Sequence, residues 1–180
     1  MKTLRKILLP CCVLLGLLIV AYTLLVVWDI RKQAAADLAA EPAERIQVMA
    51  VSAGDIAEII VHNSHGSLHF IRGDGDNWAD ASAACHPAQN KVIRLVNSVR
   101  SLTAESAFPV EETDLNAYGL EQPSMTVKLI LTDGTEQELQ VGNINRSIGR
   151  VYLMKTGEPM IYIHGTSLIQ ELDKELGDFE

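Results

Sequence analysis

Three histidines, His62, His65 and His69, follow one another with the spacing HxxHxxxH, and Cys85 and His86 come later in the chain. Imidazole nitrogen and thiolate sulfur are ligands of Zn²⁺ and Cu²⁺, so side chains brought together here could hold such an ion. The surrounding residues have the pattern of a strand, a turn and a strand, in which His62 and His69 could be cross-strand neighbours with His65 in the turn. The alternative is three histidines on the surface of a hairpin. Because a hairpin does not by itself make the three imidazoles converge, we assign no metal and no other cofactor.

The motifs of common enzyme classes are absent from the sequence. It contains no G-x-S-x-G, no P-loop and no H-E-x-x-H. The acidic segment 74–80 resembles a calcium loop only superficially, because the positions that require glycine and glutamate hold Ala79 and Cys85. We therefore expect a protein without enzymatic activity and assign no catalytic residue.

Residues 7–28 form an uncharged apolar segment of 22 residues that ends at Trp28. A helix of that length measures about 33 Å and can cross the roughly 30 Å apolar core of a bilayer. Three cations precede the segment, which favours a cytoplasmic N-terminus. We therefore predict a cytoplasmic tail at 1–6, a transmembrane helix at 7–28, a juxtamembrane stalk at 29–45 and an extracytoplasmic domain at 46–180. The predicted location is the cell membrane, crossed once.

A cleaved signal peptide is the alternative interpretation of this segment. Its apolar region usually spans 7 to 15 residues and ends at a small-residue cleavage site. Here the run is longer, and the nearest small-residue tract, Ala34–Ala36, lies beyond a charged cluster. The pattern favours an anchor that is kept.

The 148 residues after Lys32 carry 10 Lys and Arg against 22 Asp and Glu, a balance of −12. Such an acidic surface argues against binding to nucleic acid, which requires a basic stripe. The length fits one domain with a core of its own. Cys85 is the single cysteine of this part, so the domain has no internal disulfide, and we expect a buried thiol.

The pattern of apolar residues predicts an α+β domain, with a mostly antiparallel sheet built from hairpins and two main helices packed on it. Asp133-Gly134 is a strong tight-turn signal, and Gly142-Asn143 is a second expected turn. Trp78 follows the first hairpin. The expected strands are 46–50, 56–61, 68–72, 125–131, 139–141, 151–154 and 160–163, and the expected helices are 87–104 and 166–176.

Several short motifs occur in a fixed order along this domain. They are Tyr118-Gly119-Leu120 followed by Pro123, then Asp133-Gly134, Val141-Gly142 and Gly149-Arg150-Val151-Tyr152. The arrangement, over about residues 46 to 176, resembles the bacterial membrane-anchored family known as domain of unknown function 4340. The resemblance implies an N-terminal membrane helix and, as for many members, an association with ABC-type transport systems. It implies no catalytic residues. From the residues themselves, we expect Gly119 to adopt a positive φ and Leu120 to fill the core.

Two functional hypotheses follow. The first is an accessory or interaction subunit of an ABC-type transport system, bound to the bilayer through residues 7–28 and to membrane subunits of the transporter. The second is an envelope ligand-binding or sensor module that uses a groove beside the sheet. Candidate contact residues for a partner or ligand are Trp78, Tyr118, Tyr152 and Tyr162. A pocket that gathers several of them would favour the second hypothesis.

Overall fold

The structure is a computed structural model that describes residues 45–110 and 115–180. The chain divides into two compact units, Met1–Ala43 and Glu44–Glu180, and all described residues belong to the second. The expected tail, membrane span and nearly all of the stalk lie outside the described residues, so the anchor stays a prediction. Within the described ranges, no helix combines the length and apolar character needed to span a membrane.

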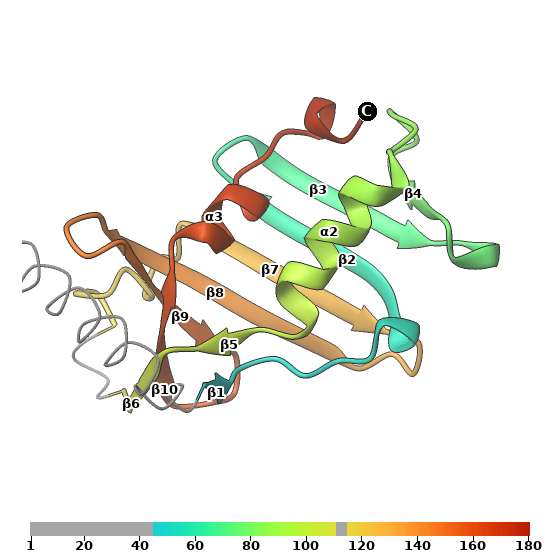
Figure 1. The fold of residues 1–180 in the computed structure, drawn as a ribbon. Coiled ribbons are helices and arrows are strands. Elements are labelled where there is room, and N and C mark those ends of the chain that lie inside the picture. The colour runs from blue at the N-terminus through green and yellow to red at the C-terminus, as the bar shows by residue number, and fades with distance from the viewer. Residues whose placement is uncertain (1–44, 111–114) are drawn as a thin grey trace, which may run out of the picture. The chain divides into compact units, whose positions relative to one another are not determined.

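An antiparallel sheet of eight strands forms the centre of the described unit (Figure 1). In spatial order the strands are β4 (Trp78–Asp80), β3 (Gly66–Arg72), β2 (Ile56–Asn63), β7 (Met125–Leu131), β8 (Glu136–Asn145), β9 (Arg150–Lys155), β10 (Met160–Gly165) and β6 (Ser106–Pro109). Two further short strands, β1 (Ile46–Gln47) and β5 (Thr103–Ala104), pair with each other. The turns at Ser64-His65 and Asp133-Gly134 join paired strands as expected.

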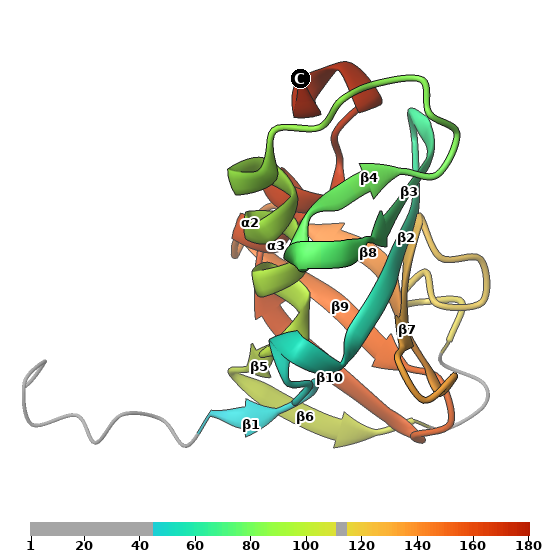
Figure 2. The ribbon, with the colours of Figure 1, turned by 90° about the vertical axis from the view of Figure 1, so that its right-hand side faces the viewer.

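Two helices, α2 (Gln89–Arg100) and α3 (Ser167–Leu172), cover one face of this sheet (Figure 2). The described residues also form three 3₁₀ turns: η1 (Ala53–Asp55), η2 (Asp74–Asp76) and η4 (Leu176–Phe179). The predicted α+β class, with a mostly antiparallel sheet and two helices, is confirmed.

The main core lies between the helices and the sheet. Val92, Leu95, Val96 and Val99 of α2 are each at most 4% exposed, in the i, i+3, i+4, i+7 pattern that predicts the helix. The sheet contributes alternate residues of its central strands. They include Ile59, Val61, Phe70, Val127, Leu129, Leu139, Val141 and Leu153.

Both helices are shorter than expected. Ser101 leaves the helical conformation, and Thr103–Ala104 form β5, which ends the predicted helix 87–104 early. The predicted helix 166–176 is divided between α3 and η4, with a break that begins at Asp173. At both places, the residues that follow the helix make tertiary contacts that end it, although their apolar pattern would allow the helix to continue.

The expected strand at 46–50 is also corrected, because only Ile46–Gln47 form a strand. Val48 and Met49 are both buried, which breaks the alternation of a strand. Their N–H groups both donate to the carbonyl oxygen of Leu102, at 2.9 and 3.1 Å. This segment therefore runs along the end of α2 instead of joining the main sheet.

The predicted turn at Gly142-Asn143 is wrong, because β8 continues through these residues to Asn145. The pairing of β8 with β9 shifts register between Val141 and Ile144, which identifies a β-bulge. The chain turns only after Asn145. Glycine and asparagine are common turn residues, but here Gly142 and Asn143 form part of the β-bulge.

The bulge holds the segment 115–124, which lies against the face of the sheet opposite to the helices (Figure 2). The N–H of Asn143 donates to the carbonyl oxygen of Tyr118 at 2.7 Å. Gly119 has φ +69°, as expected, and Leu120 is 3% exposed. Leu120 is thus one of the buried core residues, as expected. A Cβ atom at Gly142 would stand 2.2 Å from the carbonyl oxygen of Tyr118, so only glycine permits this approach.

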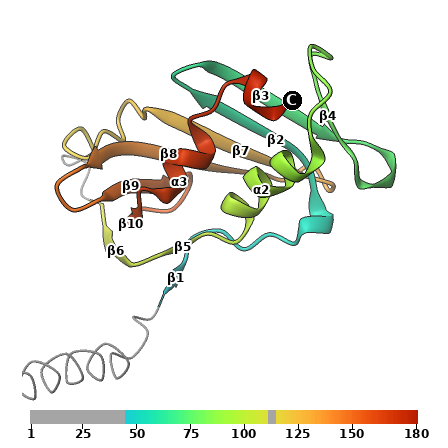
Figure 3. The same cartoon turned by 45° about the horizontal axis from the view of Figure 1, so that its top comes forward.

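The C-terminal turn η4 lies close to β3 (Figure 3). Phe179 is fully buried, and its ring centroid is 4.9 Å from that of Phe70 in β3. The N–H of Ala88 donates to the carbonyl oxygen of Phe179 at 2.6 Å. The end of the chain thus fixes the start of α2 over the sheet.

Candidate functional site

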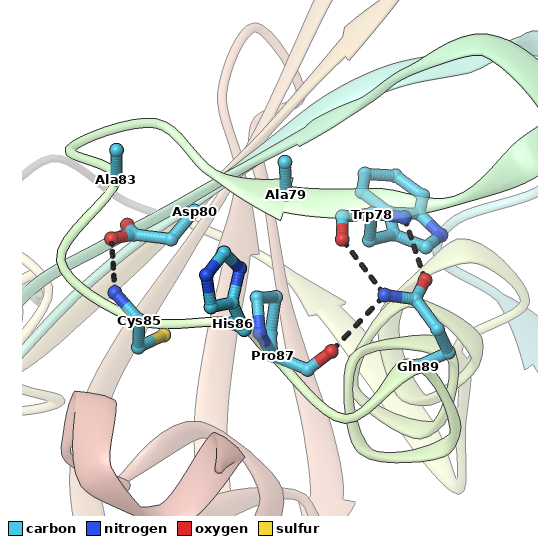
Figure 4. A pocket seen from close by; sticks show the side chains of 8 residues that line it. All are labelled: Trp78, Ala79, Asp80, Ala83, Cys85, His86, Pro87 and Gln89. Atoms are coloured by element: carbon cyan, nitrogen blue, oxygen red, sulfur yellow. Dashed lines mark hydrogen bonds between the residues drawn. The ribbon is translucent and has the colours of Figure 1, made fainter.

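Two hollows flank Trp78, which is 6% exposed at the junction of β4 and α2. The first, the β4 hollow, has a volume of about 210 Å³ and is walled by β4 and by residues of the segment 83–89 (Figure 4). The second, the α2 hollow, has a volume of about 190 Å³. Its walls are Trp78, residues of α2 (Ile93, Val96 and Asn97), and Ala53, Arg72 and Asp76. We treat the two hollows together as the Trp78 site.

Asp80 organises the loop that forms the wall of the β4 hollow. It is 8% exposed and accepts hydrogen bonds from the hydroxyl of Ser82 at 2.6 Å and from the N–H of Ala84 at 2.7 Å. These bonds, chiefly that from Ser82, lower the pKa of Asp80 despite its burial. The carboxylate is therefore charged and occupied by the loop, so it serves to fix Ala83, whose φ is +56°, and is not poised to act as a base.

Cys85 contributes a half-buried free thiol to the same hollow. Burial raises the pKa of this thiol, and the carboxylates of Asp80 and Glu180 raise it further. Since the nucleophile is the thiolate, this environment opposes nucleophilic chemistry. His86, on the same wall, is exposed and points toward the hollow (Figure 4). The β4 hollow thus contains a thiol that stays protonated at neutral pH.

Gln89 fixes β4 to the start of α2 (Figure 4). Its side-chain oxygen accepts from the N–H of Trp78 at 2.6 Å, and its amide nitrogen donates to the carbonyl oxygen of Trp78 at 2.8 Å. The same nitrogen donates to the carbonyl oxygen of Pro87 at 3.0 Å. One side chain therefore satisfies both backbone groups of Trp78 and holds the indole between the two hollows. Sequence reasoning missed this role, and the only signal was an amide residue close after Pro87.

The α2 hollow opens beside Ile93, an isoleucine that is 44% exposed. Its floor is apolar, from Trp78 and Val96. The guanidinium of Arg72 donates to the carbonyl oxygen of Ala53 at 2.7 Å and pairs with Asp76 at 2.6 Å. The hollow thus offers an apolar surface with a fixed polar edge. The sequence could not reveal it, because its walls come from η1, β3, η2, β4 and α2.

The three candidate metal-binding histidines occupy separate environments. Strand register places His62 opposite Ser67 and His69 opposite Ile60, so these two histidines are diagonal neighbours across the paired strands β2 and β3. Nε2 of His69 lies 2.6 Å from the carboxylate of Glu58, to which it donates, and His65 lies 3.7 Å from the carboxylate of Asp173 in the C-terminal segment. Across residues 45–110 and 115–180, no group of three or more His, Cys, Asp or Glu side chains is arranged to hold a metal ion.

The four aromatic candidates divide between the two faces of the sheet. Tyr118 and Tyr152 meet edge to face on the side away from the helices, with ring centroids 4.8 Å apart. Tyr162 is 5% exposed on the helix side, where its hydroxyl donates to Glu158 at 2.6 Å. Burial, followed by this carboxylate, raises the pKa of Tyr162 to about 12. Neither hollow beside Trp78 is lined by any of the three tyrosines.

Comparison with known proteins identifies one family. No curated protein and no solved structure matches the chain. Residues 78–180 match a family described as Domain of unknown function (DUF4340). The match begins at Trp78 and includes the Asp80 loop, both helices and the contact between Tyr118 and Gly142. Since it covers more than half of the 180 residues, the chain belongs to the DUF4340 family.

Proposed function

We propose that this protein is a non-catalytic interaction subunit that docks a partner protein through the Trp78 site. The proposal includes anchoring in the cell membrane through residues 7–28, with the described domain on the extracytoplasmic side. The uncharged segment of 22 residues supports this placement.

The main support for the proposed docking function is the size and character of the two hollows. Volumes of about 210 and 190 Å³ fall below the roughly 300–1,000 Å³ that is typical of small-molecule sites. Hollows of this size accept single side chains, and they flank a buried tryptophan beside an exposed isoleucine. Apolar anchors set in small pockets are what a protein interface uses to concentrate its binding energy.

The chemistry of the neighbouring groups supports a binding role over a catalytic one. The carboxylate of Asp80 is occupied by its own loop, and the thiol of Cys85 has a raised pKa. The partner we propose is a membrane subunit of an ABC-type transport system, as the family resemblance implies. The anchor would keep the Trp78 site near such a subunit and raise its effective concentration.

A polar hollow on the other side of the sheet favours the second candidate function, an envelope ligand-binding or sensor module. It has a volume of about 320 Å³ and is lined by Asn116, Gly119, Glu121, Gln122 and Asn143. This volume reaches the range of small-molecule sites. Its lining offers amides and one carboxylate, so it suits a polar ligand and not an apolar one.

Photo-cross-linking distinguishes the two candidates. A benzophenone amino acid replaces Ile93 at the α2 hollow in the full-length chain, expressed in its own membrane. Ile71, 37% exposed on the opposite face of the sheet, provides the matched control. Docking predicts a cross-link to a membrane protein from position 93 and none from position 71. Cross-links from neither position, or from position 71 alone, would contradict docking at the Trp78 site.

A further inference from the structure

The charge of α2 differs from that of the rest of the domain. Residues 81–104 contain no Asp or Glu but hold Lys91, Arg94 and Arg100, whereas the 148 residues after Lys32 carry 22 acids against 10 cations. All three cations belong to α2 and lie outside its buried stripe. An acidic domain thus presents one helix that has only positive charges.

The positive charge is concentrated at one part of this helix. Lys91, near the start, donates to the backbone oxygens of Asp178 and Glu180 at the end of the chain. Arg94 and Arg100 lie one turn to either side of Asn97 on the helix surface. Arg94 is exposed, and Arg100 donates to the side-chain oxygen of Asn97 at 2.5 Å.

This cationic line borders the α2 hollow, because Asn97 belongs to both. The acid that lines the hollow is Asp76, and its charge is offset by the ion pair with Arg72 at 2.6 Å. The surface therefore combines an apolar hollow, containing Ile93 and Val96, with two arginines whose charges no acid of α2 offsets.

We propose that the segment of the partner that docks here is acidic, with one apolar side chain in the α2 hollow and carboxylates facing Arg94 and Arg100. This inference rests on the proposed docking function. Arginine pairs with carboxylates in a planar, two-bond geometry, which gives such a contact direction as well as attraction. A concave hollow of about 190 Å³ fits a projecting side chain, whereas an anionic lipid surface would leave it unfilled.

The test continues from the cross-link at position 93 in the full-length chain. Mass spectrometry of the cross-linked peptide gives the sequence and net charge of the partner segment. A synthetic peptide with that sequence is then titrated against three forms of the protein: the unmodified chain, Arg94→Glu/Arg100→Glu and Arg94→Lys/Arg100→Lys. We expect an acidic segment and a loss of affinity of at least about tenfold in the double Glu variant. The double Lys variant should retain most of the affinity, and added salt should weaken binding.

Several other outcomes would overturn either the acidic partner or the docking function. A neutral or basic segment, equal affinity in the Glu and Lys variants, or a cross-link to phospholipid overturns the acidic partner. The absence of any protein cross-link at position 93 overturns the docking function itself. If the double Glu variant fails to fold, Arg94→Glu alone provides the comparison, because Arg94 is exposed and its removal leaves the contacts of Arg100 in place.

Discussion

Replacing Gly142 by alanine should destabilise the domain by about 2–4 kcal/mol. The new Cβ would stand 2.2 Å from the carbonyl oxygen of Tyr118 and 3.0 Å from Cγ of Leu120. The segment 115–124 would have to move off the bulge. Its departure loses the hydrogen bond from Asn143, worth about 1 kcal/mol, and exposes Leu120, worth about 1.5–3 kcal/mol.

The assay is urea denaturation of the full-length chain in detergent, followed by circular dichroism, with the thermal midpoint as a second measurement. At roughly 4 °C per kcal/mol for a domain of this size, the midpoint should fall by about 8–16 °C. Gly54→Ala is the control, because a Cβ at Gly54 meets nothing within 4 Å. It should change stability by less than about 1 kcal/mol, in the stabilising direction.

A double-mutant cycle with Leu120→Ala tests the stated mechanism. If Gly142→Ala acts by expelling the segment, Leu120 is already exposed in that variant, and the two losses should not add. A change below about 0.5 kcal/mol for Gly142→Ala, or full additivity in the cycle, would refute the reasoning.

The remaining predictions concern three titratable side chains. Asp80→Ala should cost about 2–3 kcal/mol, because it removes the charge-assisted hydrogen bonds from the hydroxyl of Ser82 and the N–H of Ala84. Because the pKa of Asp80 is lowered on folding, its contribution is complete above about pH 4 and is lost as the pH falls through the folded pKa. Asp80→Asn should therefore flatten the acid side of the stability curve, and an unchanged curve would contradict the assignment. In a Cys11→Ser/Cys12→Ser chain, Cys85 should react with iodoacetamide at pH 8 several-fold more slowly than an unstructured cysteine, since its pKa is raised; an equal or faster rate would be inconsistent with the raised pKa of this half-buried thiol. The folded pKa of Tyr162 is raised to about 12, so stability linked to its phenol persists up to about pH 10 and is lost as the pH rises toward 12. Tyr162→Phe should remove that dependence, as measured by denaturation at increasing pH.

The elements that the sequence predicts correctly are those whose own residues determine them. The strand around Ile59 is rich in β-branched residues, the strand around Val127 alternates strongly, and Asp133-Gly134 is a strong local turn signal. The apolar stripe of α2 is likewise determined by the residues of the helix itself. Such patterns specify which face is buried, and the structure confirms the α+β sheet with two helices.

The features that the sequence does not reveal depend on distant partners. Gly142-Asn143 has the composition of a turn, and only the segment 115–124 packed on it explains why β8 continues. The edge strand β6 has four residues and ends in Pro109, so it lacks the pattern of a strand. The α2 hollow cannot be predicted for the same reason, because five elements between Ala53 and Asn97 must meet before it exists. The sequence suggested Trp78 as a contact residue but gave no reason to expect Tyr118 and Tyr162 on opposite faces.

The two hydrogen bonds between the side chain of Gln89 and the backbone of Trp78 have a consequence for assembly. The open edge of a sheet normally offers unpaired N–H and C=O groups to any extended chain that passes, and this is a common route to aggregation. At the β4 edge, the side-chain amide of Gln89 makes the two hydrogen bonds with the backbone of Trp78 that a neighbouring strand would otherwise make. At the β6 edge, Pro109 has no N–H to donate. An extended chain therefore cannot form a full ladder of backbone hydrogen bonds at Trp78 or at Pro109, which disfavours edge-to-edge pairing of copies at these two positions.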